Sequence, residues 1–304
     1  MKPAIVLSSV LSVAAAPVAA AAEPAAEIEL IRDNLFLLEE AYNQEPGVIQ
    51  HIQGFVVEPK SGALSYTFTE EWPMPLDHHQ LSLTLAWSRE ASGAATRFGD
   101  LLLNYRYQAI GAGGAGWLAL APRLSLVVPT GDYRAGAGRG AMGLQANIPV
   151  SIELNPTVVL HVNAGGTMTP SARSPGGKSA NLFDAVAGLA VIWLPLSWAN
   201  AFVEVSEASV ADVGDDQRRT RTSVTTVSPA LRFAWNATPG LQVVPGVAMP
   251  VQRRDGETTV SVLGYLSIEH VLWHPEGALS PAAAPSESAS SPDAPAPVAT
   301  PSPE

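Results

Sequence analysis

The stretch Leu144-Gln-Ala-Asn-Ile-Pro-Val-Ser-Ile-Glu-Leu154 decides the fold class of this chain. Apolar side chains stand at every second position, and most of the positions between them are polar. Successive side chains of a β-strand point to opposite faces, so the stretch has one apolar and one polar face. Its length also matches the roughly 9–11 residues that a tilted membrane-spanning strand needs. The sequence therefore predicts a strand with lipid on one side and water on the other.

The same alternation recurs between residues 48 and 273. It predicts an all-β fold, an antiparallel transmembrane β-barrel of about 12 strands, and an even number is typical of bacterial outer-membrane barrels. The expected strands are 48–58, 63–72, 78–90, 98–110, 116–129, 141–154, 157–169, 182–194, 198–210, 223–235, 241–251 and 258–273.

From the third gap on, the gaps between these strands alternate in length, as expected for long outer loops and short periplasmic turns. The first gap is shorter and the second longer than this pattern predicts. The longer gaps are 90–97, 130–140, 170–181 and 211–222, and the shorter ones are 111–115, 155–156, 195–197 and 236–240. The apolar run Ala185–Val203 contains Pro195, which would break a helix. We therefore expect a hairpin there.

Composition supports a membrane barrel. Charged residues make up 15 % of the 304-residue chain, against about 25 % in ordinary soluble proteins. The net charge is −11, which disfavours nucleic acid as a partner. The chain has no cysteine, which excludes disulfides and zinc sites built on thiolates.

The two ends of the chain differ from the middle. Residues 1–22 are typical of a secretory signal peptide, with Lys2, the apolar run Ile5–Val18 and a small-residue cleavage site at Ala20–Ala22. Residues 274–304 are rich in Pro, Ala and Ser, which predicts a disordered tail.

Residues 23–47 are expected to form an N-terminal periplasmic segment. The segment is predicted to be partly helical, because Glu27–Glu40 carries a rough apolar stripe. The alternatives are a segment that plugs the barrel and one that extends the first strand.

The inward faces of the predicted strands carry charges of both signs. Such charges form either a salt-bridged plug or a selectivity constriction. The candidate lumen-lining residues are Arg106, Arg123, Glu153, His161, Asn163, Glu204 and Arg232. The tryptophans fall near strand ends, which predicts interface girdles made of Trp72, Trp87, Trp117, Trp193, Trp198, Trp235 and Trp273.

Motifs for other chemistry are weak. Two G-x-G-x-x-G matches, beginning at Gly111 and Gly138, lead into strands rather than helices, so nucleotide binding is not expected. Asp77-His78-His79 would direct its imidazoles to opposite faces. We expect no catalytic residues, no metal site and no cofactor.

Four phrases resemble one known family, the outer-membrane transporter-like proteins related to the meta-pathway phenol-degradation protein. They are Asn43–Ile52, Gly99–Tyr107, Pro129–Asp132 with the following Gly143-Leu-Gln145, and His161–Gly165. The resemblance covers roughly residues 34–273. It implies an outer-membrane barrel and the passage of hydrophobic or aromatic compounds.

The sequence thus favours a passive outer-membrane channel or transporter for small solutes, not an enzyme. The alternatives are a structural or adhesive barrel with a closed lumen and, less favoured, an outer-membrane lipid hydrolase or acyltransferase. Expected partners are outer-membrane lipid, small-molecule solutes and the barrel assembly machinery of a Gram-negative bacterium.

Overall fold

The computed structural model describes residues 32–74, 78–112, 116–238 and 240–272. All of them belong to one compact unit, residues 28–278. The expected signal peptide, the tail and Trp273 lie outside the described residues. Within the described part, no helix is long and apolar enough to cross a membrane.

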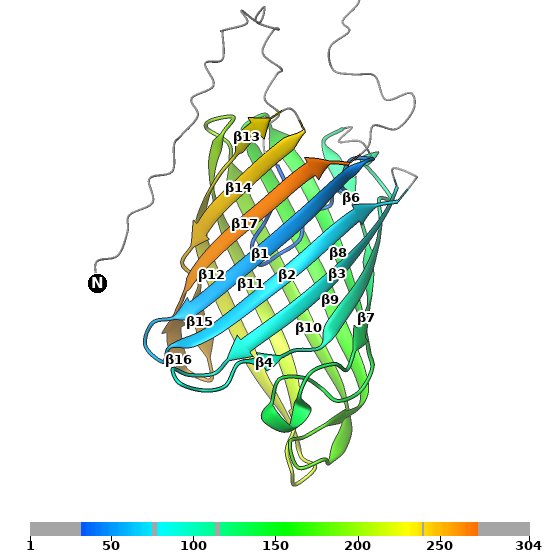
Figure 1. The fold of residues 1–304 in the computed structure, drawn as a ribbon, viewed down its shortest axis with the longest axis vertical. Coiled ribbons are helices and arrows are strands. Elements are labelled where there is room, and N and C mark those ends of the chain that lie inside the picture. The colour runs from blue at the N-terminus through cyan, green and yellow to red at the C-terminus, as the bar shows by residue number, and fades with distance from the viewer. Residues whose placement is uncertain (1–31, 75–77, 113–115, 239, 273–304) are drawn as a thin grey trace, which may run out of the picture. The chain divides into compact units, whose positions relative to one another are not determined.

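The described strands form one antiparallel sheet that closes on itself, because β1 pairs with both β2 and β17 (Figure 1). The strands are β1 (Val48–Glu58), β2 (Ala63–Pro73), β3 (His79–Arg89), β4 (Arg97–Phe98), β5 (Leu101–Tyr107), β6 (Leu118–Leu120), β7 (Arg123–Val128), β8 (Gly143–Asn155), β9 (Val158–Arg173), β10 (Ser179–Trp193), β11 (Ala199–Val213), β12 (Arg219–Phe233), β13 (Trp235–Thr238), β14 (Leu241–Ala248), β15 (Val251–Arg254), β16 (Glu257–Val260) and β17 (Val262–Val271). A short 3₁₀ turn, η2 (Tyr133–Ala135), lies between β7 and β8.

Five barrel strands are each interrupted once, so these segments make twelve barrel strands. The predicted 12-stranded antiparallel barrel is confirmed. Proline accounts for two of the interruptions, because it has no backbone N–H to donate to the ladder. Pro122 separates β6 from β7, and Pro250 separates β14 from β15. The hairpin predicted over Ala185–Val203 is confirmed as the β10–β11 turn.

The barrel has two different ends. β1 begins and β17 ends at the terminal end, and the opposite end, which holds η2, is called the loop end here (Figure 1). At the loop end, the loops predicted over 170–181 and 211–222 are wrong, because β9 to β12 continue through most of them. Pairing continues there because the two hairpins pack on each other through a small cluster of Ala172, Leu182, Ala211 and Val213.

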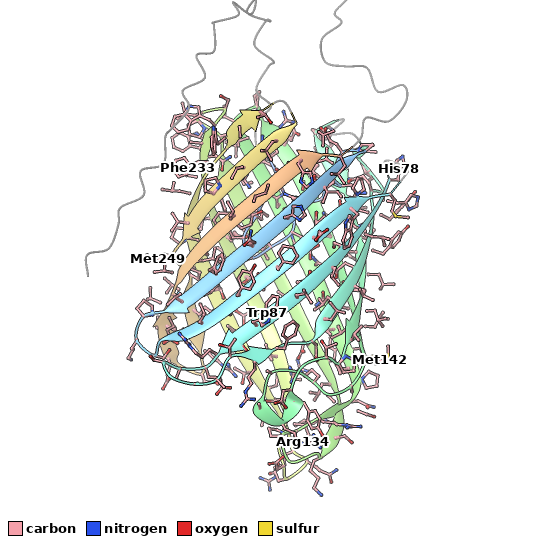
Figure 2. The ribbon with its side chains drawn as sticks, viewed as in Figure 1. His78, Trp87, Arg134, Met142, Phe233 and Met249 are labelled. Atoms are coloured by element: carbon pink, nitrogen blue, oxygen red, sulfur yellow. The ribbon has the colours of Figure 1, made fainter. Side chains whose placement is uncertain are left out.

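The two faces of the wall have opposite character. Large apolar side chains are exposed on the outside, among them Leu103, Leu144 and Ile148. The alternate positions place polar side chains inside, where Asn104, Asn147 and Ser151 are buried. Figure 2 shows side chains projecting from the outer surface from end to end. An apolar outside around a polar inside is the arrangement of a barrel that spans a bilayer.

The residues before β1 differ from the expectation. The helix predicted over Glu27–Glu40 is wrong for residues 32–40, which have neither helical nor strand structure. Residues 32–44 bond to side chains on the inner wall, so they occupy the barrel and do not form a cap outside it. The plug alternative describes them.

Candidate functional site

The barrel lumen is occupied by the chain itself. We call residues 32–47 the internal segment. Six of its backbone N–H groups donate to side chains of the wall: Leu37 and Leu38 to Glu204 Oε1 (2.9 Å each), Glu39 to Asn163 Oδ1 (3.1 Å), Ala41 to Ser151 Oγ (2.8 Å), Asn43 to Gln108 Oε1 (2.8 Å) and Gln44 to Gln80 Oε1 (2.7 Å).

Three of its carbonyl oxygens are bonded in the same way. Asn163 Nδ2 donates to Glu39 O at 2.6 Å, Gln108 Nε2 to Ala41 O at 2.7 Å, and Arg106 Nη1 to Tyr42 O at 3.0 Å. A buried backbone without secondary structure must find partners elsewhere. Here the inward side chains of the strands supply them, so the wall is built to hold an extended peptide.

Glu39 is the electrostatic centre of this contact. Its carboxylate lies 2.8 Å from Arg123 Nη2 and 3.1 Å from Arg106 Nη2, and it accepts from Asn147 Nδ2 at 2.8 Å. Burial by itself would raise the pKa of Glu39, but Arg123 and Arg106 outweigh burial and hold that pKa below its usual 4.5. Glu39 therefore stays ionised and is shared by two arginines that are direct partners on the neighbouring strands β5 and β7.

The other half of the internal segment is apolar. The ring of Phe36 stacks on Tyr265, with centroids 4.4 Å apart, and its edge meets Phe202 at 4.8 Å. Two wall glycines make room for this half: Phe36 lies against Gly246, and Leu38 against Gly188. A side chain at either glycine would occupy the space that the internal segment fills.

Each of the seven candidate lumen residues lies on a wall strand with its side chain directed into the barrel. Arg106, Arg123, Asn163 and Glu204 make the contacts above. Glu153 pairs with Arg32 at 2.6 Å, His161 Nδ1 lies 2.7 Å from Ser151 Oγ, and Arg232 Nε donates to Asn200 Oδ1 at 2.7 Å. Their role as a constriction for solute stays a prediction.

Sequence reasoning missed Glu39 and the glutamines Gln50, Gln80 and Gln108. Alternation alone places these glutamines on inward faces, so the signal was present. Gln50 Nε2 donates to Asn34 Oδ1 at 2.7 Å and to Glu269 Oε1 at 2.7 Å. No such alternation marked Glu39, because polar and apolar residues of the internal segment follow no regular period.

A cavity of about 310 Å³ adjoins the internal segment on the inside of the barrel. Its lining combines polar residues, among them Arg123, Gln145 and Asn147, with the apolar Leu37, Leu38 and Val186. Asp184 also lines it and is paired with Arg139 Nη2 at 3.4 Å. Arg123 is already bonded to Gln145 Oε1 at 2.7 Å as well as to Glu39. The cavity therefore combines an apolar surface with polar groups whose charges are largely neutralised.

The remaining candidate motifs behave as ordinary structure. His78 Nδ1 donates to Gln108 O at 2.8 Å, whereas His79 Nδ1 lies 2.7 Å from Tyr105 Oη, so the two rings have different partners. Asp77 lies outside the described residues. Among the described residues, no group of three or more His, Asp or Glu side chains is arranged to hold a metal ion.

The tryptophans lie near strand ends within the described residues. Trp117, Trp193, Trp198 and Trp235 are exposed at the terminal end. Trp87 lies toward the loop end (Figure 2), where its ring meets Phe98 at 4.6 Å and Tyr66 at 5.2 Å. Trp72 is half-buried at the end of β2. Their service as interface girdles stays a prediction.

Comparisons with known proteins identify the fold. No family model matches this chain, and no curated protein matches it. Among solved structures, an outer membrane channel from Pseudomonas putida F1 superposes with a TM-score of 0.58 at 11 % identity, covering 76 % of this chain and 97 % of that one. The superposition on the NanC porin covers 73 % of this chain and 98 % of the porin (TM-score 0.49, 8 % identity). The superposition on the toluene transporter TodX of P. putida covers 76 % of this chain and 91 % of TodX (TM-score 0.39, 10 % identity). The chain shares the barrel fold of the P. putida F1 channel over nearly the whole length of that protein.

Proposed function

We propose that this protein is an outer-membrane channel through which small solutes pass down their gradient. The observation that carries the proposal is the occupied lumen: an apolar-coated barrel holds an internal segment on its inner wall, with a cavity beside it. We further propose that the chain is exported with a cleaved signal peptide. We also place it with the transporter-like proteins that its phrases resemble.

The internal segment is held by many weak bonds and by no covalent link within the described lumen. A single intramolecular hydrogen bond contributes about 0.5–1.5 kcal/mol net. A local shift that breaks a few of them therefore costs far less than unfolding the barrel. Such a shift would join the cavity to both ends of the lumen and open a path.

The cavity also bears on the solute. Its apolar lining residues Leu37, Leu38 and Val186 offer contact to a small hydrophobic or aromatic solute. Its charged groups are paired, so it offers no strong attraction to an ion. This favours small neutral solutes, in line with the resemblance and with the toluene transporter and the monoaromatic hydrocarbon channel CymD found among the similar barrels.

The second candidate is a structural barrel with a permanently closed lumen. It is favoured by the nine main-chain bonds that fix the internal segment to the wall. In that reading the segment is part of the barrel core and never moves.

Planar-bilayer conductance and liposome swelling separate the two. We compare the full chain with a variant lacking residues 32–43, using a variant lacking 274–304 as the control for shortening the chain. A channel predicts measurable permeation by the full chain and the control, and several-fold more after removal of 32–43. No permeation by the full chain, with permeation only after removal of 32–43, would support the closed barrel. No permeation by any heat-modifiable, folded variant would contradict the channel proposal.

A further inference from the structure

The outer face of the barrel carries one polar patch where apolar residues are expected. His51 and Gln53 on β1 and Glu70 on β2 form this outer polar patch. They alternate with Gln50 and Glu71, which are buried inside the barrel, so the three patch residues point outward.

The patch is a connected group. His51 and Glu70 are direct partners in the β1–β2 register, and His51 Nδ1 lies 3.7 Å from Glu70 Oε2. Gln53 Oε1 accepts from Tyr66 Oη at 3.3 Å. The His51 ring lies between the rings of Phe68 and His270, with centroids 6.3 and 5.1 Å away.

The patch has large apolar neighbours on the outer face. Along the hydrogen-bonded row, Glu70 pairs with Leu83, Leu83 with Leu103, and Leu103 with Leu126. Along β2, the neighbouring outward residues are Phe68 and Trp72. A carboxylate and an imidazole directed at hydrocarbon are unfavourable, so such residues normally face protein or water.

We propose that this face, formed by β17, β1 and β2, is covered by a second copy of the chain related by a two-fold axis along the membrane normal. A two-fold interface brings the same patch of both copies together, so an imidazole and a carboxylate that are neighbours on one copy each meet their complement on the other. His51 then faces Glu70 of the partner subunit, and the reverse pair forms by symmetry.

The surface beside the patch has room for such a neighbour. Gly264 on β17 pairs with Phe55 on β1, and no atom lies within 4 Å of where its side chain would be. The Phe55 ring instead leans on Tyr66, with centroids 4.6 Å apart. The outer surface over Gly264 is therefore open, with no side chain lying over it.

The absence of native cysteine allows a clean cross-linking test. We place Gln53→Cys in the patch and the matched control Leu126→Cys at another exposed outward position, on β7. Both full-length variants are oxidised in proteoliposomes at two low protein-to-lipid ratios that differ tenfold. We expect a disulfide-linked dimer for Gln53→Cys at both ratios and at most trace dimer for Leu126→Cys. Equal cross-linking of the two variants, or none in either, would overturn the proposal.

The oligomeric state of the double variant His51→Leu/Glu70→Leu gives the second test. Both leucines suit a lipid-facing position, so heat-modifiable folding should persist. We expect the full chain to run as a dimer in native mass spectrometry and the double variant as a monomer. A folded double variant that remains dimeric would contradict the proposal, because the interface would then lie elsewhere. A monomeric full chain would also contradict it, because this face would then contact lipid.

Discussion

Glu39 shows how one residue can set the state of the lumen. Its carboxylate is the shared partner of Arg106 and Arg123, two cations that lie side by side on the paired strands β5 and β7. Both arginines are largely buried, with side chains 6 % and 16 % exposed. Without the carboxylate they would repel each other, so the ionised Glu39 holds the internal segment in place.

Glu39→Gln should therefore loosen the internal segment. Removing one member of a buried ion pair typically costs about 3–5 kcal/mol, because the other charge is left without compensation. We expect conductance to rise several-fold at neutral pH while the barrel stays heat-modifiable. The double variant Glu39→Gln/Arg123→Gln removes one of the stranded cations and should recover part of the closed behaviour. Unchanged conductance in Glu39→Gln would mean that the pair does not control the lumen.

At the level of elements, the internal segment and the wall are complementary in shape as well as in charge. Gly246 on β14 faces the lumen, and the Phe36 ring fills the space above it. The Phe36 ring is held there between Tyr265 and Phe202. The absence of a side chain at Gly246 thus leaves space for the Phe36 ring, and the methyl group of an alanine would occupy part of that space.

Gly246→Ala should displace Phe36 and increase permeation, in the same direction as Glu39→Gln but by a smaller factor, about two- to fivefold. The control is Gly264→Ala, an outward glycine with open space around it, which should leave permeation unchanged. In a Phe36→Ala background, Gly246→Ala should have little further effect, because the ring it displaces is gone. An equal effect in both backgrounds would show that the added methyl distorts the wall itself.

For the whole molecule, the alternation of apolar and polar residues predicted the barrel and the inward and outward faces of its strands. The two-residue period fixes which side chains of β8 and β11 face inward, so the sequence could place Asn147 and Glu204 on the inner face. It could not place the internal segment, whose partners are distant in sequence: Asn34 donates to Glu269, 235 positions away. A segment bonded through its backbone to scattered side chains leaves no periodic trace. The extensions of β9–β12 at the loop end were missed for a related reason, because the small cluster that holds them joins residues from separate hairpins and leaves no period along either one.

The closure of the barrel gives the last prediction. β17 ends at Val271 and pairs with β1 on one side and β14 on the other, so every described ladder is complete before residue 273. Truncation after residue 273 should still give a heat-modifiable folded barrel. Truncation after residue 263 removes most of β17 and leaves the edges of β1 and β14 without partners in lipid, where unpaired backbone groups are too costly to persist. We expect no heat-modifiable band for that variant on semi-native gels. Loss of the folded barrel on removing only 274–304 would show instead that this stretch is needed for assembly, even though the wall closes without it.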